Sequence, residues 1–380
     1  MTKYPGSIVS PRRVSGVRYK RPFMKPSNNP SSEQRVLRVG IAGYGVVGKR
    51  RRHFIDLHPR LKTVAVCDRV FSGTSEVDGV VAYTNAQDLL KEDLDILFVC
   101  LTNDVAADVT IAGLERGLHV FCEKPPGRDL TDVARVIACE RKHPGQKLKY
   151  GFNHRYHESV VDALRIVHSG ELGDVINMRG IYGKSRFISF GKDSDWRVER
   201  AVAGGGILLD QGIHLLDLIR LFGGEFEEVH SIVTNDFWRH DVEDNAYALM
   251  RSDRGVVASV HSTATQWRHR FSLEITLSKG AIVLSGILSG SKSYGAETMT
   301  VVFAAEDDGG DPREQKTSYK VDPSWANEIA EFSDTILNDG TVANGSSKDA
   351  LRTMQLVYRI YCADPVWLAR WNLNDKVQID

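Results

Sequence analysis

The sequence predicts an α/β protein, with an N-terminal, doubly wound parallel sheet followed by a C-terminal α/β domain that holds a large, mainly antiparallel open sheet. Two observations predict this class. Strands alternate with helices from residue 36 to about residue 152, and strands then follow one another from residue 226 onward. The length of 380 residues exceeds what one hydrophobic core usually holds, so we expect two domains, 35–152 and 153–380.

The segment 1–34 differs from the rest of the chain. It holds seven Lys or Arg, one Glu and five prolines, with little apolar periodicity. A secretory signal peptide needs a continuous apolar core, which this segment lacks. Two interpretations stay open: a flexible tail, or a basic arm that lies on a neighbouring subunit.

The first domain alternates buried strands with helices. Its strands are rich in β-branched residues and apolar along their whole length, which is typical of a parallel sheet covered on both faces. Right-handed crossovers then give the doubly wound arrangement. The predicted strands are 36–43, 61–68, 94–103, 118–125 and 147–153, and the predicted helices are 46–58, 104–117 and 130–142.

The second domain changes rhythm. Several of its strands show period-two alternation and tight turns, which is typical of an antiparallel sheet with one face covered by helices. The predicted helices are 158–170, 204–224, 324–338 and 347–363, and the predicted strands are 174–183, 226–236, 245–252, 255–267, 269–280, 280–286, 298–306 and 316–321.

Composition narrows the functional class. The formal net charge is zero, so neither a nucleic-acid partner nor a membrane partner is indicated. The chain has no run of about 18 apolar residues, the length that a membrane span requires. The five cysteines form no C-x-x-C pair. We therefore expect small buried thiols in the reducing cytoplasm and no metal site.

The segment "GIAGYGVVG" carries a dinucleotide-binding pattern. Gly43, Gly45 and Gly48 form G-x-G-x-x-G directly after a buried strand and at the start of a helix, which is the context that this motif requires. Asp68 ends the second strand, where a carboxylate accepts hydrogen bonds from ribose hydroxyls and repels a 2′-phosphate. NAD is therefore favoured, while the neighbouring Arg69 keeps NADP as the alternative.

The charge run "KRRRH" (49–53) occupies the first turns of that helix. Positive charge there opposes the helix dipole. We expect this run to form a solvated outer face, and the alternative is that it screens the cofactor phosphates.

Two later segments carry residues suited to proton transfer. Lys124, in "FCEKPPG", follows the fourth strand at the carboxyl edge of the sheet, where open α/β sheets bind ligands. There it can hydrogen bond a reacting hydroxyl and share in proton transfer. Asp210 and His214 lie one helical turn apart in "GGGILLDQGIHLLDLIRLFGG". We expect the histidine to act as acid or base while the carboxylate orients its ring.

These segments together resemble one known family. The trio "GYGVVG", "EKPPG" and "GGGILLDQGIHLLD" resembles the Gfo/Idh/MocA family of sugar and cyclitol oxidoreductases over residues 36–380. The resemblance implies a Rossmann domain, a Lys124–Pro125 peptide that is often cis, and a catalytic set of Lys124, Asp210 and His214. It also implies a structural role for Asp217 and a homodimer or homotetramer formed through the C-terminal sheet.

The remaining site residues are predicted from their position beside these motifs. Further cations and aromatic rings at 184–186 and 267–270 suggest an anionic carbohydrate, such as a nucleotide sugar. The predicted cofactor-binding residues are Gly43, Tyr44, Gly45, Val46, Val47, Gly48, Asp68, Arg69, Leu101, Thr102, Asn103, Glu123 and Lys124. The predicted substrate-binding residues are Asn153, Arg155, Tyr156, Lys184, Trp196 and Arg197.

The predicted reaction is hydride transfer between a nicotinamide and a ring carbon of a sugar or cyclitol. Two alternatives have the same fold: a glycoside hydrolase that uses tightly held NAD, and a regulator that senses NAD(P) without chemistry. The sequence leaves open the sugar, the direction of the reaction, the choice of NAD or NADP, and the oligomeric state.

Overall fold

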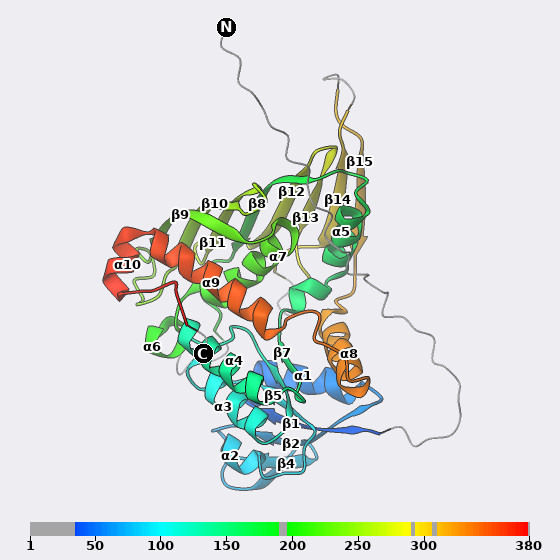
Figure 1. Cartoon of the computed structure of the whole chain (residues 1–380), viewed down its shortest axis with the longest axis vertical. Coiled ribbons are helices and arrows are strands. Elements are labelled where there is room, and N and C mark those ends of the chain that lie inside the picture. Colours follow the sequence, from blue (N-terminus) through cyan, green and yellow to red (C-terminus); the bar gives the residue numbers. More distant parts are fainter. Residues whose placement is uncertain (1–34, 190–195, 290–292, 306–309, 379–380) are drawn as a thin grey trace, which may run out of the picture. The chain divides into compact units, whose positions relative to one another are not determined.

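The computed structural model describes residues 35–189, 196–289, 293–305 and 310–378. The predicted basic tail, 1–34, lies outside the described residues, and both interpretations of it stay predictions. The described chain holds one sheet of seven strands and one of eight strands, which confirms the predicted fold class (Figure 1).

The first sheet has the strand order β3-β4-β2-β1-β5-β6-β7. Every neighbouring pair is parallel except β3 with β4. The sequence did not predict this pair, because three or four residues are too few for a period to stand out. The strands are β1 (Leu37–Ala42), β2 (Leu61–Cys67), β3 (Ser75–Val77), β4 (Val80–Tyr83), β5 (Ile96–Val99), β6 (His119–Cys122) and β7 (Leu148–Tyr150).

Helices cover both faces of this sheet. Helices α2, α3 and α4 pack on one face, and α1 packs on the other together with α8, a helix from beyond residue 152. On the α8 side, Phe332 meets Phe121 edge-on at 5.7 Å between ring centroids. Part of the chain beyond residue 152 thus packs on the first sheet. The predicted domain boundary at residue 152 stays a prediction. The helices are α1 (Val46–Asp56), α2 (Ala86–Leu89), α3 (Asn103–Glu115), α4 (Leu130–Lys142) and α8 (Ser324–Leu337).

The second sheet has the strand order β15-β14-β13-β12-β8-β11-β10-β9. All neighbours are antiparallel except β8 with β11, as expected for a mainly antiparallel sheet. The strands are β8 (Val175–Gly183), β9 (Phe226–Thr234), β10 (Asn245–Ser252), β11 (Val257–Thr263), β12 (Arg270–Leu277), β13 (Gly280–Ser285), β14 (Glu297–Phe303) and β15 (Glu314–Tyr319).

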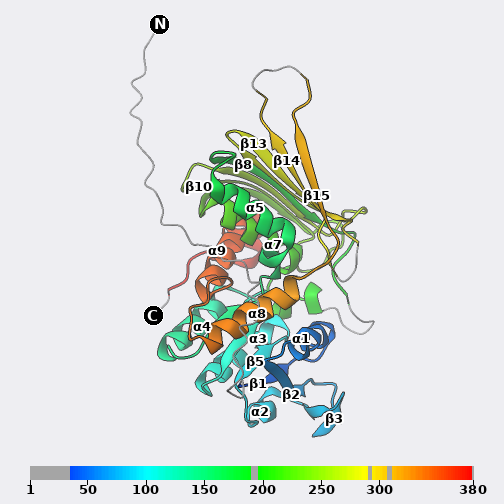
Figure 2. The same cartoon turned by 90° about the vertical axis from the view of Figure 1, so that its right-hand side faces the viewer.

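One face of the second sheet is covered by α5, α7 and α9 (Figure 2). The other face is open, with Ile232, Tyr247 and Leu249 each about half exposed. A last helix, α10, was not predicted, although Asp364 caps it and Pro365 begins it. The remaining helices are η1 (Asn153–Tyr156), α5 (Glu158–Ser169), η2 (Trp196–Val198), α6 (Arg200–Ala203), η3 (Leu208–Gly212), α7 (Ile213–Gly223), α9 (Ser347–Ala363) and α10 (Pro365–Trp371).

The apolar segment around Asp210 forms a core helix with an irregular first turn. Residues Leu208–Gly212 are a π-helix, and regular α-helix follows in α7. The stretch Arg200–Gly223 is long and apolar enough to cross a membrane, but 89% of its most apolar window is buried inside the protein. Its glycines crowd against protein backbone, since a Cβ at Gly206 would lie 2.2 Å from the carbonyl oxygen of Glu243.

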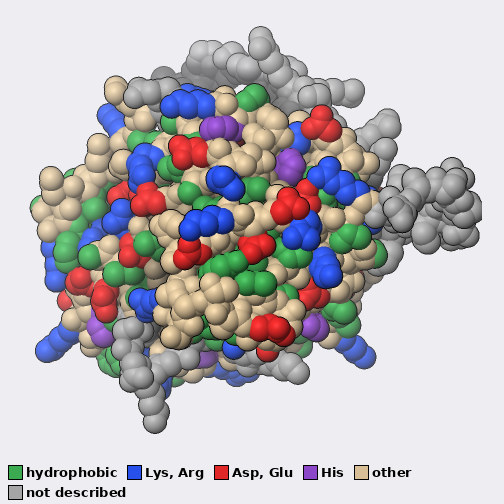
Figure 3. Space-filling view, turned by 90° about the horizontal axis from the view of Figure 1, so that it is seen from below, with side chains coloured by type: hydrophobic (Ala, Val, Ile, Leu, Met, Phe, Trp, Pro, Cys, Tyr) green, Lys and Arg blue, Asp and Glu red, His purple; other side chains and the backbone are tan. Residues whose placement is uncertain are grey.

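Charges on the surface seen from below in Figure 3 are mixed, with acidic and basic side chains interspersed. One cation of the run 49–53 does not reach the surface. Arg51 is fully buried, so the expected solvated outer face is wrong at this residue. Burying a guanidinium requires carboxylate partners, and these come from outside helix α1.

Candidate active site

The glycine-rich turn between β1 and α1 has the shape that a dinucleotide needs. A Cβ at Gly43 would lie 2.2 Å from the carbonyl oxygen of Cys100, and one at Gly48 would lie 1.9 Å from that of Gly43. A Cβ at Gly45 would meet nothing within 4 Å, so the space above this backbone is open. No side chain caps the start of α1, where Val46 and Val47 form the first turn. Open amides at a helix N-terminus fit a pyrophosphate.

Asp68 is fixed beside this turn. Its carboxylate accepts hydrogen bonds from the backbone N–H of Tyr44 (2.8 Å) and of Val70 (3.2 Å). The neighbouring Arg69 is exposed. The arrangement places a fixed negative charge where a ribose would lie, which fits NAD better than a 2′-phosphate.

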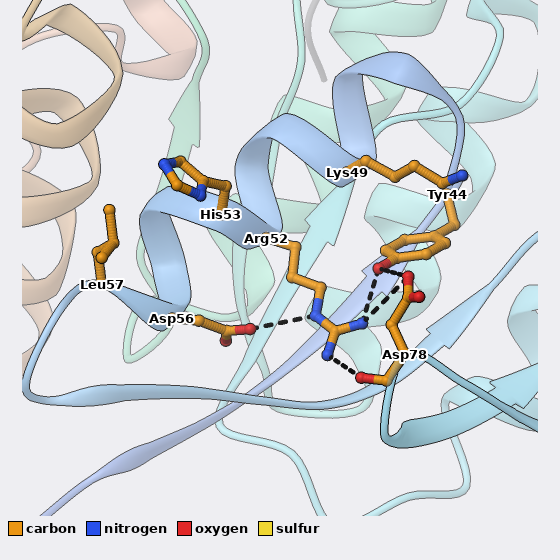
Figure 4. Close-up of a pocket in the computed structure, with 7 residues that line it drawn as sticks. All are labelled: Tyr44, Lys49, Arg52, His53, Asp56, Leu57 and Asp78. Carbon is orange, nitrogen blue, oxygen red and sulfur yellow. Dashed lines mark hydrogen bonds and ion pairs between the residues drawn. The ribbon is translucent and has the colours of Figure 1, made fainter.

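A hollow of about 380 Å³ adjoins the outer side of this turn (Figure 4). Its charged groups largely satisfy one another. Arg52 donates to the hydroxyl of Tyr44 (2.7 Å) and to Asp56 (3.1 Å), and Tyr44 donates to Asp78 (2.9 Å). These bonds hold the side chain of Tyr44 against the β3–β4 turn, so they support the glycine-rich turn from outside.

The predicted cofactor residues after β5 lie at the same edge of the sheet. Leu101 and Thr102 precede α3, and Asn103 is its first residue. The buried amide of Asn103 donates to the carbonyl oxygen of Ala203 (2.8 Å). This bond ties the carboxyl edge of the first sheet to α6 of the second half.

Glu123 belongs to a buried ion cluster that sequence reasoning missed. Arg51 contacts Glu123 (2.6 Å) and Glu328 (2.8 Å), and its guanidinium lies between the rings of Phe121 and Trp325. Burial raises the pKa of Glu328 to about 7, although Arg51 opposes this shift. The cluster links α1, the segment before Lys124 and α8, so it fixes the positions of these three elements relative to one another.

Lys124 meets Asp210 across the two halves of the chain. The Lys124–Pro125 peptide is cis, as the resemblance implies. The ammonium of Lys124 donates to the backbone oxygen of Asp210 (2.5 Å) and to its carboxylate (3.1 Å). Arg197 lies 3.4 Å from the other carboxylate oxygen. Burial alone would raise the pKa of Asp210, but these cations hold it below its usual value. The carboxylate orients Lys124, instead of the imidazole ring that we expected it to orient.

His214 is buried beneath this pair. Its Nδ1 has no hydrogen-bond partner among the described residues. Burial and the nearby Lys124 ammonium lower its pKa well below the usual range. The ring stacks on His154, with 3.8 Å between centroids. Such an unsatisfied buried nitrogen is rare, and the ring belongs to the interior beside Lys124 and Asp210.

The segment after β7 is tied into the fold more than sequence predicted. Arg155 donates to both oxygens of Asp217 (2.7 and 2.6 Å) and contacts Asp349 (3.1 Å). The amide of Asn153 donates to Ser324 (3.1 Å). Such bonds leave Arg155 little capacity for a substrate, and Asp217 has the structural partner that its predicted role requires.

Tyr156 is likewise committed. It accepts a hydrogen bond from Lys149 (2.6 Å) and donates one to Glu331 (2.7 Å), and its side chain is buried. Its prediction as a substrate-binding residue therefore has no support from these contacts.

Several polar residues near His214 lie outside the predicted substrate-binding set. His154 contacts the hydroxyl of Tyr182 (3.2 Å) through Nε2, and Gln211 hydrogen bonds Tyr294. The Oε1 of Gln211 is buried and has no partner among the described residues. His154 lies between the predicted residues Asn153 and Arg155, and Gln211 follows Asp210, so both had a signal in the sequence. Tyr182 and Tyr294 come from separate segments and share no motif with them.

The other cations and aromatic residues predicted near the substrate differ in their exposure to solvent. Lys184 is half-buried at the end of β8, and Arg197 lies over the ring of Trp196, 4.3 Å from its centroid. Arg186, Trp267 and Arg268 are exposed.

Comparison with known families matches more than half of the chain. Residues 37–152 match the oxidoreductase family with an NAD-binding Rossmann fold, described as GFO/IDH/MocA, and residues 160–283 match the GFO/IDH/MocA C-terminal domain. The uncharacterized oxidoreductase YrbE of Bacillus subtilis is 26% identical over 280 residues, which cover 71% of this chain and 78% of YrbE. An inositol 2-dehydrogenase of Salmonella typhimurium is 31% identical over 151 residues, which cover 38% of this chain and 45% of that protein.

Solved structures share the fold. A levoglucosan dehydrogenase in complex with NADH and levoglucosan superposes with a TM-score of 0.75 at 20% identity, covering 88% of this chain and 98% of that one. At this identity the likeness concerns the fold alone.

Proposed function

The chain belongs to the GFO/IDH/MocA family of oxidoreductases, and from this premise we propose that it transfers a hydride between a nicotinamide cofactor and a ring carbon of a sugar or cyclitol. One observation carries the proposal. Lys124, from the carboxyl edge of the first sheet, meets Asp210 beside a buried His214 whose Nδ1 is unsatisfied. Named relatives of the chain act on inositol and levoglucosan, which are cyclic polyols.

The turn 43–48, Asp68 and the segment 101–103 would hold the cofactor. When bound, NAD supplies the hydride acceptor for alcohol oxidation. We propose NAD as the preferred cofactor, because both oxygens of Asp68 are fixed by backbone N–H groups and Arg69 is exposed. A fixed carboxylate at that place disfavours a 2′-phosphate.

The chain's own residues divide the proton chemistry. His214 is neutral at pH 7, because burial and Lys124 lower its pKa. A neutral imidazole accepts the proton of a substrate hydroxyl, and we assign this step to the ring of His214. Lys124 donates a hydrogen bond to the same substrate oxygen. Asp210 holds the Lys124 ammonium in place, since it accepts a hydrogen bond from it at 3.1 Å.

Substitutions at His214 and Lys124 test this proposal. Formation of the reduced nicotinamide is measured by absorbance over a panel of sugars and cyclitols, with wild type, His214→Ala and Lys124→Ala. We expect each variant to lose about 10²- to 10⁴-fold in kcat on the active substrate. His168→Ala, which changes an exposed histidine near the end of α5, is the matched control. Wild-type rates in both site variants would contradict the assignment.

We also propose a homo-oligomer formed through the open face of the second sheet, in the cytoplasm. A sheet face with half-exposed Ile232, Tyr247 and Leu249 is apolar enough to seek a partner. Light scattering after size exclusion gives the subunit count. Leu249→Asp is expected to shift that count toward the monomer, and an unchanged count would contradict this interface.

A further inference from the structure

Lys184 and His269 lie side by side at the ends of β8 and β12, two central strands of the second sheet. Lys184 follows β8 and His269 precedes β12, and Gly183 pairs with Arg270 in the antiparallel register, so the two residues are the next pair along. The backbone of Lys184 is held on both sides, by Thr263 (2.9 Å) and Gln266 (2.8 Å). The position of this pair is therefore fixed by the sheet.

Lys184 has no ion-pair partner in the described chain, and one nitrogen of His269 is buried without a hydrogen-bond partner. No carboxylate of the described chain lies within ion-pair distance of Lys184. Asp210 is the acid whose charge acts most on Lys184, but its carboxylate already pairs with Lys124 and Arg197. The Nδ1 of His269 is buried without a hydrogen-bond partner in the described residues, while its Nε2 contacts Ser185 (3.0 Å). Partial burial of an ammonium without a counter-ion is costly, so the site is suited to an anion.

We propose that Lys184 and His269 form a subsite for a carboxylate on the substrate, which makes that substrate a sugar acid. The inference rests on the proposed function, because it places the carboxylate on the ring that Lys124 and His214 act upon. The single charge of the Lys184 ammonium matches the single charge of a carboxylate, and the His269 ring lies beside it. A diphosphate carries more charge than this pair can neutralise. The subsite thus narrows the predicted anionic carbohydrate from a nucleotide sugar to an acid.

Burial supports the same assignment. It lowers the pKa of Lys184 and of His269, as expected when cationic groups leave water. The nearby cations Lys124 and Arg197 act on Lys184 in the same direction, and Asp210 alone opposes them. A bound carboxylate would relieve this imbalance.

Equilibrium binding tests the subsite without turnover. The full chain, saturated with NADH, is titrated by calorimetry with matched pairs: glucuronate and glucose, galacturonate and galactose, and mannuronate and mannose. We expect wild type to bind the acid of at least one pair about 10- to 100-fold more tightly than its neutral partner. Lys184→Gln is expected to remove this preference, and Lys184→Arg to retain most of it. Lys279→Gln, an exposed cation just past the other end of β12, is the control that should keep it.

The outcomes separate the two proposals. If wild type binds no acid more tightly than its neutral partner, or if Lys184→Gln and Lys279→Gln change the preference equally, the subsite is overturned. Turnover is then measured on the same pairs. Binding that depends on Lys184, without any turnover, would support the subsite and contradict the proposed reaction. Turnover of neutral sugars without acid preference would do the reverse.

Discussion

Two carboxylates seven residues apart on one helical stretch have opposite surroundings. Asp217 is closed: Arg155 grips both of its oxygens at 2.6 and 2.7 Å, Thr353 donates at 3.2 Å, and its side chain is 1% exposed. Asp210 is looser. Its contacts with Lys124 and Arg197 are 3.1 and 3.4 Å long, and its side chain is 14% exposed.

The difference separates a group that holds the fold from one that is available to a substrate. A saturated buried pair has no capacity left, and removal of one partner leaves an uncompensated charge. A loosely held carboxylate has lone pairs that remain available to a ligand. When one of its partners is removed, water can take that partner's place. Arg155 and Asp217 therefore belong to the framework, whereas Lys124 and Asp210 belong to the site.

The largest expected effect is on the closed pair. Asp217→Ala strands Arg155 in the interior with Asp349 as its remaining carboxylate, 3.1 Å away. We expect a loss of about 3–5 kcal/mol in the free energy of unfolding, measured by urea titration. Asp349→Ala is the control, and it should cost less because the bidentate pair survives. A loss for Asp217→Ala no larger than that of the control would break the comparison.

The open pair should respond in the opposite way. Asp210→Asn keeps the shape but removes the charge that orients Lys124. We expect kcat to fall about 10²-fold or more, while the free energy of unfolding falls by less than it does in Asp217→Ala, because Asp210 is held less tightly. Steady-state kinetics and the same urea titration measure both. A variant that loses stability but keeps its rate would place Asp210 with the framework.

The pH profile sharpens the role of His214. Its pKa is lowered by burial and by Lys124, so the imidazole stays neutral, and able to accept a proton, at pH values where an ordinary histidine is half charged. We expect kcat/KM for alcohol oxidation to show no loss centred near pH 6.5, the pKa of an exposed histidine, as the pH falls from 8 to 6. A clear inflection near 6.5 would show that the proton acceptor is a solvated group.

The sequence predicts the framework best where local geometry dictates the residue. The glycine-rich turn was readable because Gly43 and Gly48 have no room for a Cβ. The strand and helix rhythm likewise predicts both sheets. The short hairpin of β3 and β4 gave no such signal, since it is too brief to show a period.

Partnerships between distant residues were not readable. Arg155 was predicted to bind substrate and Arg51 to face solvent, yet their partners include Asp349 and Glu328, far along the chain. A charge in a sequence shows its sign but not its partner, and the partner decides whether it is structural. The joint placement of Lys124 with Asp210 was predictable only because three motifs occur together.

The smallest expected effect concerns the buried ion cluster in which Arg51 pairs with both Glu123 and Glu328. The pKa of Glu328 is raised by burial to about 7, above its value in an unfolded chain. The native state therefore holds this proton more tightly, so the contribution to stability is fully present below about pH 4.5 and is lost as the pH rises through 7. Wild type should lose at most about 1.4 kcal/mol per pH unit between about pH 5 and 7 through this group, and almost nothing further above about pH 8. Glu328→Gln, which carries no titrating proton, should flatten that slope, as measured by urea titration across the range. Asp93→Asn, at an exposed surface pair, is the control. Parallel curves for wild type and Glu328→Gln would show that Arg51 keeps both carboxylates charged, and the cluster would then resemble the closed pair at Asp217.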